Sequence, residues 1–406
     1  MFGGCGTQVN QGTEANQSTQ TNESVQENIQ SSPSVDSGMI EIDTSDMFSG
    51  RDKEVGYDET ESVFIQLSDD GSACESAAAL IEGNTITITD EGTYILSGTL
   101  TDGMVAVAAE DTDKVQLVLD NVNISNSESA ALYILSADKV FVTTAAGSEN
   151  TMENGGNYTA IDENNIDAAV FSKSDLTFNG EGKLTVTAKA GHGIVSKDDL
   201  AFTCGTYEIT SADYGISGKD SVRIANGSYK IVSGKDGIHA ENADDADLGF
   251  VYVADGTFEI ISGQDGISAG SWLQIEDGDY EVTTGEGSAA AKNQNMRERM
   301  SADREAEAAA AEEDSASIKG IKAGAQMVLK SGAYTLDTED DALHSNGTIT
   351  ISGGAYTLSS GDDGIHAGAS VLISGGSLDI AQSYFCLRTA QEQYFVPGWP
   401  KRNILL

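Results

Sequence analysis

The chain has 406 residues, with 45 glycines, 3 prolines and 6% aromatic residues, a composition typical of a long β-rich protein with many tight turns. Its formal net charge of −43 leaves no basic surface to neutralise phosphates, so direct binding to nucleic acid is excluded. The same charge disfavours unaided attraction to anionic lipid or polysaccharide and fits a secreted surface that carries metal ions.

The first residues predict a lipid anchor and a tether. Residues 2–5 (FGGC) resemble the end of a bacterial lipobox, in which small residues stand just before a cysteine, and we expect Cys5 to carry the lipid. Residues 6–37 are almost all small and polar, so they cannot bury enough apolar area to fold. Residues 1–37 are therefore interpreted as a lipobox remnant and a disordered polar tether. The expected protein is an extracellular, cell-surface lipoprotein whose lipid is its only contact with a membrane.

Residues 38–130 are predicted to form an N-terminal β cap and the first coils of a repeating structure. Three segments are strand-like with turn signals between them, namely 85–88 (TITI), 93–96 (TYIL) and 115–119 (VQLVL). A cap is expected there because an open end would expose unpaired strands and apolar core.

A repeat of 22 residues dominates the second half of the chain. The segment 341–344 (DALH) recurs 22 residues later as 363–366 (DGIH), and each copy is followed by an alternating apolar run that ends in Gly-Gly. Related triplets occur at 168–170, 192–194, 214–216, 236–238, 265–267 and 319–321. Helical spacing of the apolar residues is absent, whereas a fixed period with short alternating runs is typical of a solenoid. The sequence therefore predicts an all-β, single-stranded parallel β-helix with about 22 residues in each coil.

The β-helix is expected to span residues 131–382, with one interruption. Residues 287–317 are rich in Ala, Glu and Met and are interpreted as a loop insertion on one face. From 383 to 406 the repeat signature is lost and two of the 3 prolines appear, so this tail is interpreted as divergent and frameshifted, the alternative being a native C-terminal cap. Resequencing of the locus tests this hypothesis, and an intact frame through residue 406 would contradict it.

Several segments, taken in their order along the chain, resemble one family. They are 48–52 (FSGRD), 94–100 (YILSGTL), 115–122 (VQLVLDNV), 171–176 (FSKSDL) and the repeated Asp-Gly-Ile. This set is similar to the carbohydrate-binding domain-containing protein family of anaerobic Firmicutes, over roughly residues 40–382. The resemblance implies a right-handed β-helix akin to pectate lyases, calcium binding, and adhesion to plant cell-wall polymers such as cellulose and polygalacturonate. It does not by itself imply catalysis.

Aspartates recur at one position of the coils, which indicates a cation site. Neighbouring coils lie ~4.8 Å apart, so stacked carboxylates repel by about 1 kcal/mol in water and by more in a less polar setting. Ca²⁺ relieves such repulsion because it accepts many oxygen ligands in flexible geometry. The expected calcium ligands are Asp236, Asp265, Asp340, Asp341, Asp362 and Asp363, with Asp244 and Asp247 of an acidic insertion completing the shell. The alternative is that Asp precedes Gly only because it suits tight turns.

Three histidines and one tryptophan are the candidates for contact with carbohydrate. His239, His344 and His366 follow an inward-facing apolar residue, so strand alternation turns them outward. A stack of His344 on His366 also suits a transition metal, but oxygen ligands dominate nearby and favour calcium, and a simple packing ladder is the more common arrangement. Trp272 is out of phase with Leu273 and is expected to point outward and stack on a sugar ring.

Aromatic residues recur at a second position of the coils. Each stands two residues before an aliphatic residue on the same face of its strand, so we expect an internal aromatic stack. Its members are Tyr207, Tyr229, Phe258, Tyr280, Tyr334 and Tyr356.

These observations predict a monomeric, non-catalytic protein that binds plant cell-wall polysaccharide, either cellulose or pectin, at the bacterial surface in a calcium-dependent way. Divalent cations would bridge an acidic polymer to the protein's own carboxylates. A calcium-dependent pectate lyase-like enzyme is the first alternative, but the sequence pairs no Lys or Arg with the aspartates to abstract the proton next to the uronate carboxylate. A structural adhesin that binds a protein partner is the second alternative.

Overall fold

The computed structural model describes residues 42–290, 317–389 and 394–395. Within these ranges the protein is all-β, as predicted, with 36 strands and one short 3-10 helix, η1 (Arg51–Lys53). No helix in the described ranges has the length and apolar character needed to cross a membrane. The predicted lipidation site Cys5, the tether 1–37 and most of the insertion (291–316) lie outside the described residues.

The strands form two sheets, which we call sheet A, with 23 strands, and sheet B, with 13. From β8 onward, each coil passes one strand of sheet B and two strands of sheet A, and each strand pairs in parallel with the strand three places later. Sheet B consists of β3 (Ala79–Glu82), β4 (Thr85–Ile88), β6 (Met104–Ala108), β8 (Leu132–Ser136), β11 (Ala168–Ser172), β14 (His192–Ser196), β17 (Ile216–Gly218), β20 (Ile238–Ala240), β23 (Ile267–Ala269), β26 (Ile321–Ala323), β29 (Leu343–Ser345), β32 (Ile365–Ala367) and β35 (Arg388–Thr389).

Sheet A contains two series of strands that follow sheet B in turn, together with four N-terminal strands. The first series is β9 (Lys139–Thr144), β12 (Asp175–Gly180), β15 (Asp199–Phe202), β18 (Ser221–Ile224), β21 (Phe250–Val253), β24 (Trp272–Ile275), β27 (Gln326–Leu329), β30 (Thr348–Ile351), β33 (Ser370–Ile373) and β36 (Tyr394–Phe395). The second series is β10 (Glu149–Asn154), β13 (Lys183–Ala188), β16 (Thr206–Ser211), β19 (Ser228–Ser233), β22 (Thr257–Ser262), β25 (Asp279–Thr284), β28 (Ala333–Thr338), β31 (Ala355–Ser360) and β34 (Ser377–Gln382). The N-terminal strands are β1 (Val63–Leu67), β2 (Ala73–Cys74), β5 (Gly92–Leu100) and β7 (Lys114–Asn126).

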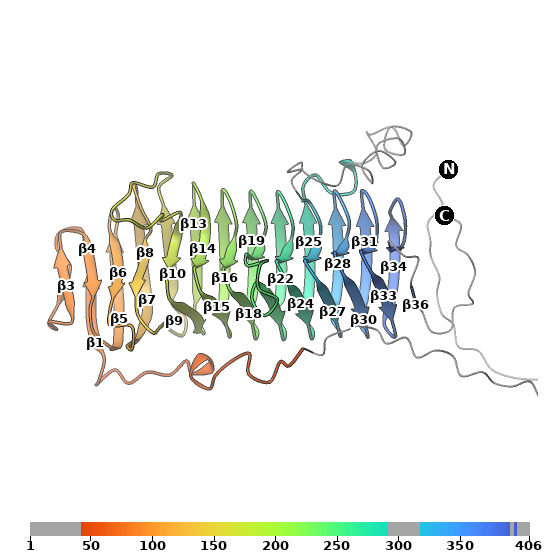
Figure 1. Cartoon of the computed structure of the whole chain (residues 1–406). Coiled ribbons are helices and arrows are strands. Elements are labelled where there is room, and N and C mark those ends of the chain that lie inside the picture. The colour runs from red at the N-terminus through yellow and green to blue at the C-terminus, as the bar shows by residue number, and fades with distance from the viewer. Residues whose placement is uncertain (1–41, 291–316, 390–393, 396–406) are drawn as a thin grey trace, which may run out of the picture.

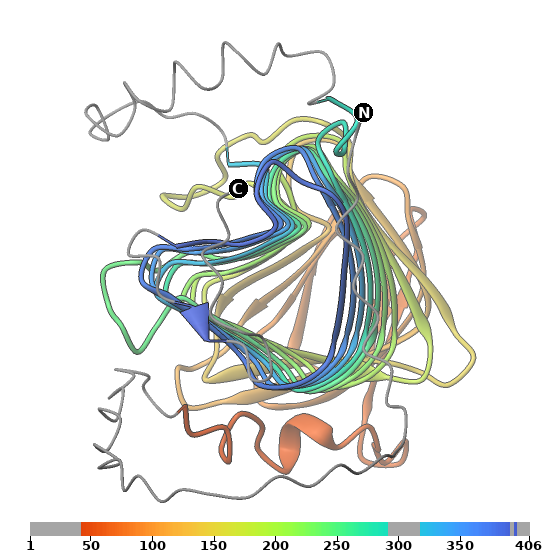
Figure 2. The same cartoon turned by 90° about the vertical axis from the view of Figure 1, so that its right-hand side faces the viewer.

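The register of the strands reproduces the repeat seen in the sequence. Tyr207 pairs with Tyr229, and Leu343 pairs with Ile365, each 22 residues further on. Figure 1 shows the coils side by side along the molecule, and Figure 2 shows them overlying one another when the stack is viewed from its end. Equivalent residues of successive coils therefore form straight columns on the inside and the outside of the stack.

The predicted internal aromatic stack is confirmed. Tyr207, Tyr229, Phe258, Tyr280, Tyr334 and Tyr356 are all buried. Their successive ring centroids lie 4.5 to 5.2 Å apart, at interplanar angles from 3° to 17°. The Tyr229 hydroxyl donates to the Asn226 carbonyl oxygen at 2.9 Å, so its polar end is satisfied inside the core. Gly227, which lies between Asn226 and Tyr229 in the chain, has a φ of +138°. A Cβ at this position would lie 2.8 Å from the Tyr229 hydroxyl oxygen, so glycine is required.

Antiparallel pairs cover the end of the stack formed by the N-terminal strands. β1 pairs with β2 and β3 pairs with β4 in antiparallel fashion, whereas β1 joins β5 and β4 joins β6 in parallel. In Figure 1 these strands form the orange end of the molecule. They fall within the range 38–130, where the sequence predicts a cap and first coils.

Residues 42–62 form a segment that the sequence does not predict, which we call the N-terminal strap. Figure 1 shows it running along the side of several coils rather than across the end of the stack. The Arg51 guanidinium lies 4.5 Å from the centroid of the Phe141 ring. Arg223 donates to the carbonyl oxygen of Met47 at 3.2 Å. The strap is thus fastened to coils that are far apart in the sequence.

Asp52 is the main polar anchor of the strap, and its replacement by Ala should destabilise the protein by about 2–3 kcal/mol. The buried carboxylate lies 2.8 Å from the Lys139 ammonium and accepts a hydrogen bond of 2.8 Å from Thr177. Burial alone would raise its pKa, but hydrogen bonds from Lys139 and Ser49 lower the pKa to about 2. Its contribution should therefore be complete above the unfolded pKa of about 3.9 and disappear as the pH falls toward about 2.

Urea unfolding at several pH values measures this effect, with Asp46→Ala as the control because Asp46 is an exposed residue of the same strap. Equal loss of stability in Asp46→Ala and Asp52→Ala would contradict the anchoring role of Asp52.

The start of the tail follows the pattern of the coils although its sequence departs from the repeat. Arg388 pairs in parallel with His366, and β36 pairs in parallel with β33. Residues 390–393 and 396–406 lie outside the described ranges, so the frameshift of 383–406 stays a prediction for resequencing.

Candidate functional site

The middle residues of the short sheet B strands form a line on the outer surface of the stack. In β20, β26, β29 and β32 the flanking residues are buried and the middle one is only partly exposed. The strand register places these residues on successive coils. We call Ser217, His239, Ser268, Lys322, His344, His366 and Arg388 the sheet B column. The predicted outward histidines are therefore found here, but they are not freely exposed.

Four of the predicted aspartates are buried beside this column and hold the backbone of the next coil. Asp236, Asp265, Asp341 and Asp363 are buried. In each, Oδ1 accepts the backbone N–H at the equivalent position one coil further on, at 2.7 to 3.2 Å. At this position Lys319 stands between Asp265 and Asp341, so the predicted column of stacked carboxylates is interrupted.

The second oxygen of each buried aspartate faces a basic side chain of the sheet B column. Oδ2 of Asp236 lies 2.7 Å from His239 Nδ1, and Oδ2 of Asp265 lies 3.2 Å from Lys322 Nζ. Oδ2 of Asp363 lies 3.6 Å from Arg388. The expectation that no Lys or Arg accompanies these aspartates is therefore wrong, because both bases come from the next coil. The sequence contained this information, because Lys322 and Arg388 directly follow the apolar residue of their repeats.

Asp341 has two such partners. Its Oδ2 lies 2.7 Å from Nδ1 of His344 in the same coil and 3.1 Å from Nδ1 of His366 in the next. Burial raises the pKa of this carboxyl, but the hydrogen bonds from both histidines outweigh burial and hold the pKa well below its usual range. For Asp363 the balance is the opposite, because burial and the nearby Asp341 and Asp362 carboxylates outweigh the lowering effect of His366 and Arg388 and raise its pKa to about 7.

Two groups of side chains in the described ranges bring three potential metal ligands together. One is Asp340, Asp341 and Asp362, and the other is Asp341, His344 and His366, with the ligand atoms of each group within 4.8 Å of one another. Asp244 and Asp247 belong to neither group. They lie in the turn that follows β20, whereas the aspartates of both groups precede sheet B strands. The expectation that this insertion completes the calcium shell is thus not supported by its position.

The Asp340 carboxylate already has a cationic neighbour, since Lys319 Nζ lies 2.6 Å from its Oδ2. A cation at Asp340, Asp341 and Asp362 would have to displace this ammonium group or share the carboxylate with it. The Lys319 ammonium group thus neutralises the Asp340 carboxylate in this structure.

Trp272 is half-buried, and one face of its indole is already covered. The ring of Phe250 stacks on it with centroids 4.1 Å apart and an interplanar angle of 5°. On the other side the register places Gln326 of the next coil. A sugar would therefore meet the edges of two stacked rings at this point rather than a free indole face, and the proposed stacking stays a prediction.

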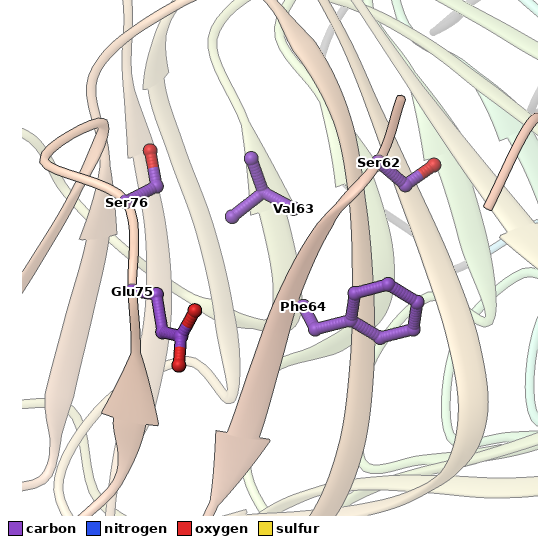
Figure 3. Close-up of a pocket in the computed structure, with 5 residues that line it drawn as sticks. All are labelled: Ser62, Val63, Phe64, Glu75 and Ser76. Carbon is purple, nitrogen blue, oxygen red and sulfur yellow. The ribbon is translucent and has the colours of Figure 1, made fainter. Parts of the chain in front are cut away.

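A shallow pocket lies near the N-terminal end of the stack, away from these groups. It has a volume of about 310 Å³ and is lined by Ser62, Val63, Phe64, Glu75 and Ser76. Figure 3 shows Phe64 on β1 and Glu75 just after the end of β2. None of the predicted site residues lines it.

The sequence profile of a family described as "Carbohydrate-binding domain-containing protein" matches residues 82–364. A protein of that name from Acetivibrio thermocellus is 38% identical over 126 residues, which are 30% of this chain and 44% of that protein. The matched part thus spans less than half of the relative's length.

A solved structure also resembles this chain. It is described as the structure of the polysaccharide lyase-like protein from C. thermocellum, a gadolinium derivative, and is 32% identical with a TM-score of 0.52. The match covers 54% of this chain and 91% of that one.

Proposed function

Because the chain belongs to the carbohydrate-binding domain-containing protein family, we propose that its coils form a right-handed parallel β-helix that binds plant cell-wall polysaccharide. In this proposal the protein acts outside the cell as a monomer, held at the bacterial surface by a lipid on Cys5. The polymer is cellulose or pectin, and binding does not involve cleavage. The match of the family over residues 82–364 is the observation that carries the proposal.

We propose further that calcium is required for binding to acidic polymer. The carboxylates of Asp340, Asp341 and Asp362 supply ligand atoms within 4.8 Å of one another, and Ca²⁺ prefers such oxygen ligands. A calcium ion there would also contact carboxylates of polygalacturonate, so that the net charge of −43 no longer opposes binding. Asp236, Asp265 and Asp363 each bind a backbone N–H of the next coil and are not assigned to this group.

Retention of the full-length protein on polygalacturonate and on cellulose tests this proposal. EDTA should weaken binding to polygalacturonate at least about tenfold, a loss of about 1.4 kcal/mol, and Ca²⁺ but not Zn²⁺ should restore it. The double variant Asp340→Asn/Asp362→Asn should show the same loss without EDTA. The control is Asp244→Asn/Asp247→Asn, which changes the net charge equally. Binding that survives EDTA unchanged would exclude the calcium bridge, and no retention on either polymer would exclude the wider proposal.

A polysaccharide lyase is the second candidate, and one observation favours it. Lys322 and Arg388 each lie on the outer surface beside a buried carboxylate, and a lyase needs a basic residue to abstract the proton next to the uronate carboxylate. Incubation with polygalacturonate distinguishes the two functions. Unsaturated products that absorb in the ultraviolet would identify a lyase, whereas retention without product identifies a binding protein.

A further inference from the structure

Two imidazoles and one carboxylate converge where β29 and β32 lie side by side. His344 and His366 are paired in the register of these strands, and each directs Nδ1 toward Oδ2 of Asp341. The rings are nearly perpendicular, at 85°, with centroids 4.8 Å apart. Two nitrogens and an oxygen therefore face one common point rather than forming separate pairs.

The orientation of the carboxylate at this point is fixed by the backbone. Asp341 is 2% exposed, and its Oδ1 accepts the Asp363 N–H at 2.9 Å. Rotation of the side chain would break this bond in a buried place, where an unsatisfied N–H is costly. Oδ2 is thus held toward the two imidazoles.

The second nitrogen of His344 has a polar partner of its own. Nε2 lies 3.0 Å from Oδ1 of Asn346, which can accept its hydrogen. In that tautomer Nδ1 presents a lone pair to the Asp341 oxygen 2.7 Å away, and a metal ion between the two atoms would be bound by both. A hydrogen bond from the outer nitrogen to an amide oxygen is also the usual arrangement in metal-binding histidines.

Asp363 provides an independent observation. It is 0% exposed, and its Oδ2 has no hydrogen-bond partner. This oxygen lies 3.9 Å from Nδ1 of His366, so it borders the same cluster, with Arg388 at 3.6 Å as its other charged neighbour. A buried carboxylate oxygen without a hydrogen bond is unfavourable, and a cation nearby would stabilise it.

We propose that Asp341, His344 and His366 form a binding site for a divalent transition-metal ion of the Zn²⁺ class. Imidazole nitrogen together with carboxylate oxygen suits Zn²⁺, Co²⁺ and Ni²⁺, whereas Ca²⁺ prefers oxygen alone. Ligand atoms on one Zn²⁺ lie about 3.3 Å apart, so the pairs at 2.7 and 3.1 Å would have to open by about 0.6 and about 0.2 Å. The side chains of His344 and His366 are 14% and 24% exposed, so the cluster can be reached from the outer surface. This site shares the Asp341 carboxylate with the proposed calcium group, so the two ions would compete for its Oδ2 atom, but the site itself does not require calcium or carbohydrate binding.

The chain contains its own control for this arrangement. Asp236 and His239 repeat the same contact, with 2.7 Å between Oδ2 and Nδ1, but the next coil has Ser268 in place of the second histidine. This single pair lacks the third ligand and should bind Zn²⁺ only weakly.

Calorimetric titration of the metal-free, full-length protein with Zn²⁺ tests the proposal. A second titration with Co²⁺ gives a visible spectrum that reports nitrogen ligands. One equivalent should bind, and excess Ca²⁺ should not displace it. His366→Ser, which copies the arrangement beside His239, should weaken binding by about 100-fold or more, whereas His239→Ser should leave it unchanged. Asn346→Ala should weaken it by about tenfold through loss of the outer hydrogen bond.

Circular dichroism and urea unfolding of the same variants show that they fold. Asn346 is exposed, so its variant retains the structure even where a histidine variant does not. The proposal is overturned if the protein binds no Zn²⁺ at micromolar concentration, if excess Ca²⁺ displaces the bound Zn²⁺, or if His239→Ser weakens binding as much as His366→Ser does.

Discussion

Replacement of Phe258 by Ala should lower the free energy of unfolding by about 3–5 kcal/mol, the largest effect expected of any single substitution here. Phe258 is 1% exposed and lies between the rings of Tyr229 and Tyr280, at 4.9 and 4.7 Å. Its removal would leave a cavity that neither neighbour can fill, because both tyrosine hydroxyls donate to backbone carbonyl oxygens and hold the rings in place.

Urea unfolding followed by circular dichroism and tyrosine fluorescence measures this loss. Ile261→Ala is the matched control, since Ile261 belongs to the same strand but is 47% exposed, and it should cost less than about 1 kcal/mol. Similar losses for the two variants would show that the aromatic stack adds little to the stability of the coils.

Replacement of Asp341 by Ala should destabilise the protein by about 2–4 kcal/mol near pH 6. The substitution leaves the Asp363 N–H without its acceptor and both His344 and His366 without their buried counter-ion. The sign of the pH dependence follows from the pKa shifts of the two partners. The lowered pKa of Asp341 makes its contribution present above about pH 3.9 and lost as the pH falls through the folded-state value.

The raised pKa of His366 acts in the opposite direction. Burial alone would lower this pKa, but Asp341 raises it, so the contribution is complete below about pH 6.5 and lost as the pH rises through the folded-state value. The difference between wild type and Asp341→Ala should therefore be largest from about pH 4 to about pH 6.5. Asp340→Ala is the control, because that carboxylate is partly exposed and lacks both histidine contacts. A difference that does not vary with pH would contradict the assignment.

The periodic part of this structure was predictable from the sequence because it depends on local alternation. Apolar residues at every second position determine which face of a strand is buried, and this placed Tyr229 and Phe258 in one internal stack before any contact was known. The 22-residue step, read from 341–344 and 363–366, likewise determined that Leu343 pairs with Ile365.

Only the tertiary structure decided which polar side chains meet. The repeat signature identified Asp265 and Asp341, yet it did not show that one oxygen of each binds the backbone of the next coil. Lys322 reaches Asp265 across an insertion, and Asp52 of the strap reaches Lys139 from outside the repeat. Such pairs depend on how the coils are stacked and on which carboxylate oxygen of the aspartate is not already bound to a backbone N–H. Periodicity specifies the face on which a side chain lies, whereas its partner is specified by residues distant in the chain that folding brings beside it.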